Sequence, residues 1–169
     1  VFCGFISIVL ASEAHYFLSA IFIIAAAIFD SLDGIVARLL KTSSKFGVEL
    51  DSLSDVVSFG AAPAFLIYKA YLYQFGYAGI FISSLILVFG AFRLARFNVQ
   101  LENIETKGDF RGLPIPLSAI TLAFFIISFY KNGMIIEPYN DFLIPLVIMF
   151  SLLMVSTLKY NSFTKLKNQ

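Results

Sequence analysis

The chain has 169 residues, of which 59% are hydrophobic and only 14% are charged, and its formal net charge at pH 7 is +1. Soluble domains carry about a quarter charged residues, so this composition argues against a soluble protein and for one embedded in lipid. The small net charge gives no support for a nucleic-acid partner. The length suits one compact domain over residues 1–169, because no polar linker divides the chain.

Six apolar segments follow one another along the chain. The first, residues 1–11, is too short to cross a bilayer, which needs about 20 residues, so we expect a helix whose N-terminal half is missing from this sequence. The other five segments run over residues 16–40, 46–68, 77–97, 112–130 and 142–158. The sequence therefore predicts an all-α, polytopic membrane bundle of six transmembrane helices, the first of them truncated here.

Lysines and arginines gather in alternate connections between these segments. If the connection after the second helix is cytosolic, two basic residues, Lys69 and Lys131, lie on the outer side. The cytosolic side then holds Arg38, Lys41, Lys45, Arg93, Arg96, Lys107, Arg111, Lys159, Lys165 and Lys167. An excess of basic residues marks cytoplasmic loops, so we expect a multi-pass cell-membrane protein in this orientation.

Two carboxylates interrupt the second apolar segment near its cytosolic end. An unpaired charge inside a membrane helix costs at least about 2.5 kcal/mol, so Asp30 and Asp33 must have partners. At about 100° per residue, both aspartates share one helix face with Gly34, Ala37 and Arg38. This face should point into the bundle and away from lipid.

The third segment carries a matching stripe at the same membrane level, with Gly47, Asp51 and Asp55 spaced four residues apart. Four carboxylates facing one another repel unless cations neutralise them. Ligation by oxygen alone favours Mg²⁺ or Mn²⁺, with Ca²⁺ as a further option, over zinc. Four carboxylates can hold two such ions about 3.5–4 Å apart, so we expect two divalent cations.

The small residues on the two stripes have two readings. Gly34, Ala37 and Gly47 leave room for a nucleotide or a phosphate to approach the helix backbone. They are equally suited to close packing between helices, which small residues commonly support in membrane proteins.

The pattern Asp30-x-x-Asp33-Gly34-x-x-Ala37-Arg38, eight further residues and Gly47-x-x-x-Asp51-x-x-x-Asp55 resembles the signature of the CDP-alcohol phosphatidyltransferase family at all eight fixed positions. The resemblance implies a CDP-activated lipid as donor, CMP as product, a surrounding of membrane lipids and a homodimer. It implies metal ligation by Asp30, Asp33, Asp51 and Asp55, with Asp55 also as general base. It implies contact with CDP or phosphate by Asp33, Gly34, Ala37, Arg38, Ser43 and Gly47.

Three further stretches, residues 46–63, 93–98 and 110–116, resemble the branch of this family that uses serine as acceptor. The resemblance implies CDP-diacylglycerol and L-serine as substrates. Glycerol 3-phosphate or inositol phosphate as the acceptor, and an archaeol-type lipid as the donor, stay open. Candidates for binding the serine carboxylate or phosphate are Arg93, Arg96, Asn98 and Arg111. For each arginine, anchoring to anionic headgroups is an equal alternative.

A divalent-cation transporter is the main rival from another class, because intramembrane carboxylates also mark ion paths. An ion path should continue across the membrane, but the last three helices contain no acidic residue between the level of the aspartates and the outer side. A non-catalytic scaffold gives no reason for four clustered carboxylates. A covalent route through histidine nucleophiles is disfavoured because the single histidine, His15, lies in the opposite loop.

Overall fold

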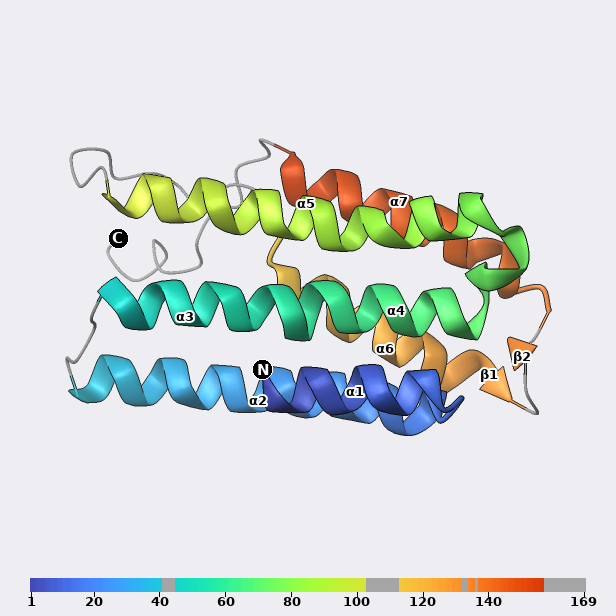
Figure 1. The fold of residues 1–169 in the computed structure, drawn as a ribbon, viewed down its shortest axis with the longest axis horizontal. Coiled ribbons are helices and arrows are strands. Elements are labelled where there is room, and N and C mark those ends of the chain that lie inside the picture. Colours follow the sequence, from blue (N-terminus) through green and yellow to red (C-terminus); the bar gives the residue numbers. More distant parts are fainter. Residues whose placement is uncertain (41–44, 103–112, 132–133, 136, 157–169) are drawn as a thin grey trace, which may run out of the picture.

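The computed structural model of the chain describes residues 1–40, 45–102, 113–131, 134–135 and 137–156. Helices dominate it (Figure 1). The elements are α1 (Phe2–Ser12), α2 (Tyr16–Leu40), α3 (Lys45–Asp55), η1 (Val56–Ala61), α4 (Ala62–Ala70), η2 (Leu72–Phe75), α5 (Tyr77–Glu102), α6 (Ile115–Phe129), β1 (Tyr130–Lys131), β2 (Met134–Ile135) and α7 (Asn140–Val155).

The helices lie roughly side by side, and three of them are long and apolar enough to cross a membrane: Tyr16–Val36, Phe46–Ala70 and Tyr77–Val99 (Figure 1). The helices α1, α6 and α7 are apolar but shorter. The expected all-α membrane bundle is therefore confirmed, whereas the number of six transmembrane helices stays a prediction. Helix α6 begins at Ile115, three residues later than expected, because Pro114 holds an extended backbone at its N-cap.

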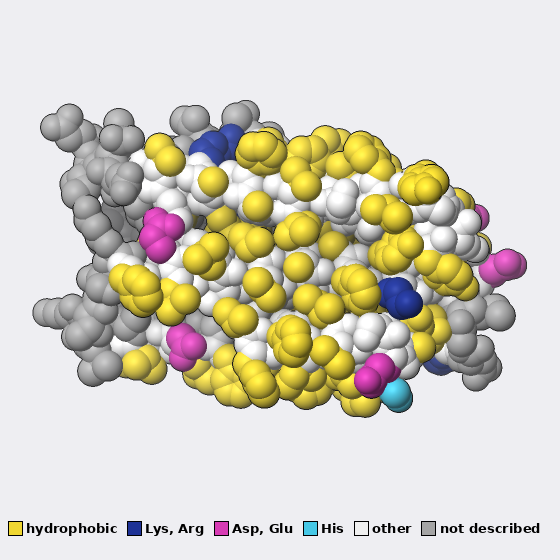
Figure 2. Space-filling model, viewed as in Figure 1, with side chains coloured by type: hydrophobic (Ala, Val, Ile, Leu, Met, Phe, Trp, Pro, Cys, Tyr) yellow, Lys and Arg dark blue, Asp and Glu magenta, His cyan; other side chains and the backbone are white. Residues whose placement is uncertain are grey.

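Hydrophobic side chains cover much of the face of the bundle seen in Figure 2. Large side chains such as Phe2, Phe81 and Phe92 are 75%, 67% and 64% exposed, which suits contact with lipid tails. The interior contains small residues that let the helices approach closely. A Cβ on Gly4 would lie only 2.7 Å from the Cα of Ser58, so α1 packs directly against η1.

One continuous helix runs from Lys45 to Ala70, and its middle, η1, is wider than an α-helix. The N–H of Ala62 donates to the carbonyl of Val57, five residues earlier, which is the π-helical pattern. Pro63 follows at once; it has no N–H to continue the ordinary ladder, and its ring crowds the preceding turn. The wide turn starts immediately after Asp55, so it lies beside the aspartate cluster.

A short antiparallel pair, β1 with β2, lies between α6 and α7 and pairs Tyr130 with Ile135. This pair could not be predicted from the sequence, since strands of two residues are shorter than any alternating pattern that can be recognised. It leaves the all-α architecture unchanged.

Candidate active site

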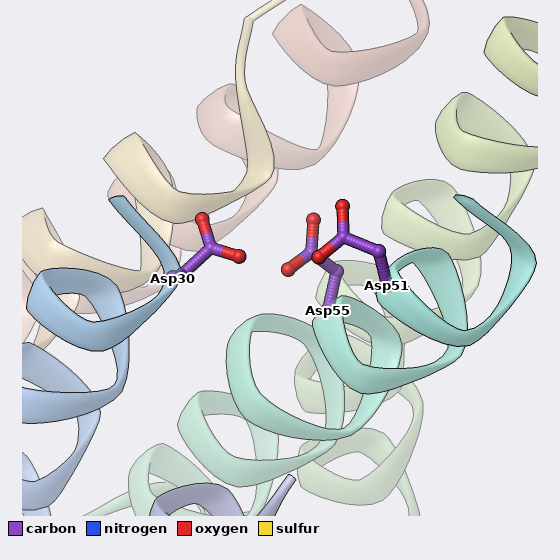
Figure 3. Close-up of side chains that lie close together, drawn as sticks. All are labelled: Asp30, Asp51 and Asp55. Atoms are coloured by element: carbon purple, nitrogen blue, oxygen red, sulfur yellow. The ribbon is translucent and has the colours of Figure 1, made fainter. Parts of the chain in front are cut away.

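Three of the four predicted aspartates come together between two helices. Asp30 of α2 faces Asp51 and Asp55 of α3, and one carboxylate oxygen from each lies within 4.8 Å of the others (Figure 3). Asp51 and Asp55 are one helical turn apart, so both project from the same side of α3. The predicted facing of the two stripes is therefore present for these three residues.

These three carboxylates fit a hard divalent cation. They offer only oxygen, which Mg²⁺, Mn²⁺ and Ca²⁺ prefer. Asp30 and Asp55 are partly buried, where mutual repulsion is screened less than in water. A bound cation would remove that repulsion, so the geometry is suited to metal binding.

Asp33 does not belong to this close group. Its side chain is exposed on α2, nearer the end of the helix than Asp30. It does line the same cavity as the other three aspartates. The structure thus places all four at one cavity but brings only three within reach of a single ion.

This cavity has a volume of about 370 Å³ and combines carboxylates with apolar walls. Its lining residues are Val1, Phe2, Cys3, Ala26, Phe29, Asp30, Asp33, Asp51, Ser54, Asp55, Ser58 and Phe59. The contribution of residues 1–3 could not be found from the sequence, because that segment carries only apolar side chains and a cysteine. A cavity with an acidic part and an apolar part suits a ligand with a phosphate end and a lipid end.

Two of the predicted arginines have described side chains, Arg93 and Arg96, and of these Arg93 of α5 interacts with the aspartate cluster. Its charge interacts with that of Asp55. Its Nε is buried and has no hydrogen-bond partner within the described part of the chain. A buried donor without a partner is costly, so this nitrogen is available for an anionic ligand.

Arg96, one turn further along α5, has a different environment. Its guanidinium donates to the carbonyl of Val155, the last residue of α7, over 3.4 Å. A cation at a helix C-terminus stabilises the unpaired carbonyl groups there. Arg96 therefore connects α5 to α7 and lacks the buried, unpaired donor that distinguishes Arg93.

Asn98 joins α5 to α3. Its amide nitrogen donates to the hydroxyl of Ser52 over 3.0 Å and to a carboxylate oxygen of Glu49 over 3.4 Å. Ser52 directly follows Asp51, so Asn98 holds the part of α3 that carries the aspartates. Sequence spacing could not reveal this pairing, because Asn98 and Ser52 lie on different helices.

The remaining predicted contacts are only partly visible. Gly34 and Gly47 are both exposed. A Cβ added to Gly34 would meet nothing within 4 Å in the described part of the chain, so close helix packing does not account for this glycine. Ser43 and Arg111 lie outside the described residues, as do the side chains of Ala37 and Arg38.

The chain is similar to known proteins over most of its length. Residues 1–157 match the model of a family described as CDP-alcohol phosphatidyltransferase. A CDP-diacylglycerol–serine O-phosphatidyltransferase of Helicobacter pylori (strain ATCC 700392 / 26695) is 38% identical over 167 residues, covering 99% of this chain and 70% of that protein. The enzyme of the same name from Bacillus subtilis (strain 168) is 34% identical, covering 96% and 85%.

An archaeal relative is similar to the same degree. The archaetidylserine synthase of Methanothermobacter thermautotrophicus (strain ATCC 29096 and its equivalents) is 42% identical over 161 residues, covering 93% of this chain and 64% of that protein. The names of these relatives share serine as the acceptor and differ in the lipid.

Proposed function

Since this chain belongs to the CDP-alcohol phosphatidyltransferase family, we propose that it transfers a phosphatidyl group from CDP-diacylglycerol to the hydroxyl of L-serine, releasing CMP. The observation that carries the proposal is the cavity where four aspartates meet apolar walls. The names of the Helicobacter pylori and Bacillus subtilis relatives support CDP-diacylglycerol and serine as the substrates.

The reaction is one exchange at phosphorus. The serine oxygen forms a bond to the lipid-side phosphorus, the bond from that phosphorus to the CMP oxygen breaks, and the serine proton passes to Asp55. Asp55 suits this task because it is the last aspartate of the stripe on α3, one helical turn beyond Asp51, and its carboxylate lies close to those of Asp30 and Asp51. The proposal makes it the general base.

The aspartates also supply the metal ligands of the proposal. Asp30, Asp51 and Asp55 would hold one divalent cation, and Asp33 would contribute to a second from the same cavity. Mg²⁺ or Mn²⁺ bound there would neutralise charge on the phosphoryl oxygens. Contacts to the pyrophosphate and nucleotide are assigned to Gly34, Ala37, Arg38, Ser43 and Gly47, and the open space beside Gly34 supports this for that residue.

Arg93 is the residue proposed to bind the serine carboxylate, because its buried Nε has no described partner and its charge reaches Asp55. Arg93→Ala should raise the KM for serine at least about tenfold, as expected for loss of a charge-assisted hydrogen bond. Steady-state CMP release at varied serine and saturating CDP-diacylglycerol measures it. Arg96→Ala is the matched control, and the role fails if both variants change KM alike.

The choice of acceptor can be tested on purified protein. Each reaction contains CDP-diacylglycerol, Mn²⁺ or Mg²⁺, and one acceptor: serine, glycerol 3-phosphate or inositol phosphate. CMP should be released rapidly only in the reaction with serine. Release with glycerol 3-phosphate and not with serine would overturn the acceptor and leave the family chemistry intact. The same assay with an archaeol-type CDP-lipid decides the donor, a question raised by the archaeal relative.

Orientation and assembly complete the proposal. The excess of basic residues supports an aspartate end that faces the cytosol, where serine and CMP are soluble. The family resemblance suggests a homodimer.

A transporter is less well supported: in the described helices, no acidic residue lies between the aspartate cluster and the far end, where Glu13, Glu137 and Asp141 are exposed.

A further inference from the structure

A second polar cavity lies at the opposite end of the bundle from the aspartates. It has a volume of about 370 Å³ and is lined by Tyr16, Tyr68, Lys69, Ala70, Tyr73 and Tyr130. These residues come from the start of α2, the end of α4, η2 and β1, which meet at one end of the molecule (Figure 1). None of them takes part in the proposed transfer reaction.

The walls of this cavity are fixed by direct contacts. The hydroxyl of Tyr16 donates to the carbonyl of Lys69 over 2.9 Å. The rings of Tyr16 and Tyr130 meet edge to face with their centroids 5.0 Å apart. Three segments distant in sequence are therefore held around the cavity by tyrosines.

The Lys69 ammonium and the hydroxyls of Tyr73 and Tyr130 are hydrogen-bond donors among the residues that line the cavity. Burial, together with the neighbouring phenols of Tyr16 and Tyr73, raises the pKa of Tyr130, so its hydroxyl keeps its proton. Among the described residues, no carboxylate lies within ion-pair distance of the Lys69 side chain, and no aspartate or glutamate lines the cavity. A cation flanked by neutral phenols is complementary to an anion that has several acceptor oxygens.

The position of the cavity identifies the source of that anion. One candidate membrane span begins at Tyr16 and another ends at Ala70, so the cavity lies where apolar surface gives way to polar surface. Tyrosine is enriched at this level of a membrane, and lysine there attracts anionic headgroups. A phospholipid can present its phosphate here while its tails follow the apolar surface of the bundle.

We propose that the cavity of Tyr16, Tyr68, Lys69, Tyr73 and Tyr130 binds the phosphate of an anionic phospholipid at the membrane face opposite the aspartates. Lys69 supplies the charge, and the hydroxyls of Tyr73 and Tyr130 supply hydrogen bonds. The site is independent of the transfer reaction, so it holds whether or not serine is the acceptor.

Native mass spectrometry of the full chain titrated with short-chain phosphatidylglycerol tests the proposal. Lys69→Gln should weaken binding of one lipid per chain about fivefold, the effect expected for one lysine near a lipid surface. Lys131→Gln is the matched control, because Lys131 is exposed beside Tyr130 but does not line the cavity. Tyr130→Phe removes only a hydroxyl and should weaken the same binding event.

Three outcomes would overturn the site. The first is unchanged lipid binding in Lys69→Gln. The second is an equal loss of binding in Lys131→Gln, as expected if basic residues attract the lipid without a specific site. The third is displacement of the lipid by millimolar inorganic phosphate, which would indicate a site for free phosphate. CMP release measured on each variant reports correct folding, because the cavity is remote from the aspartates. If the wild-type protein did not transfer a phosphatidyl group to serine, the proposed function would be contradicted, but the result of the lipid titration would stand.

Discussion

Asp55→Asn should abolish turnover while CDP-diacylglycerol still binds. The amide has nearly the same shape as the carboxyl group but cannot take the serine proton, so the rate should fall at least about 10²-fold, the lower end of what general acid–base catalysis contributes. CMP release gives the rate, and calorimetric titration with CDP-diacylglycerol gives the affinity. The structure supports this choice because Asp55 lines the cavity and its charge interacts with that of Arg93.

The control for this variant is Asp141→Asn, which removes an exposed carboxylate in the first turn of α7, away from the cavity. It should turn over normally. Near-normal turnover of Asp55→Asn would remove that residue from the role of base. Loss of both turnover and donor binding would instead make metal ligation its main task.

Metal dependence should be equally marked. Chelation of divalent ions by EDTA should stop CMP release, and added Mn²⁺ should restore it, because three carboxylates within 4.8 Å repel one another and a bound cation would offset that repulsion. Asp30→Asn removes one of the three charges and should weaken Mn²⁺ binding by more than about tenfold. The electron paramagnetic resonance signal of free Mn²⁺ measures this affinity and counts the ions bound per chain.

Glu49→Gln provides the matched control for Asp30→Asn, since Glu49 is an exposed carboxylate of α3 outside the close group. Its Mn²⁺ affinity should equal that of wild-type protein. An unchanged affinity in Asp30→Asn would contradict its role as ligand. A stoichiometry of one ion per chain would leave the triad in place and exclude the second ion.

The sequence predicted the helices and the convergence of four aspartates, because hydropathy and helical spacing are local properties. Three of the four, Asp30, Asp51 and Asp55, form the close group, whereas Asp33 only lines the same cavity. The sequence could not separate Arg93 from Arg96. Both arginines occur at one membrane level, but residues three apart on a helix meet different neighbours. Only the packed structure shows that the charge of Arg93 interacts with Asp55, whereas Arg96 binds the end of α7. Asn98 illustrates the same limit, since its partner Ser52 is 46 positions away.

The wide turn after Asp55 was equally hidden in the sequence. Pro63 is visible, and a kink near a proline is expected. The position of the widened backbone upstream, at Val56–Ala61, depends on how that segment packs against α1 and α5.

This turn has a consequence for how the protein can change in evolution. Val56–Ala61 contains one more residue than an α-helical path would use, and the wide turn absorbs it, so the halves of the span keep the faces they would have on an uninterrupted α-helix. If the turn became an ordinary α-helix with all its residues kept, one half would rotate by about 100° against the other. Either the aspartates or buried residues such as Leu66 would then face lipid. Loss of one residue from this segment should therefore be tolerated better than insertion of one.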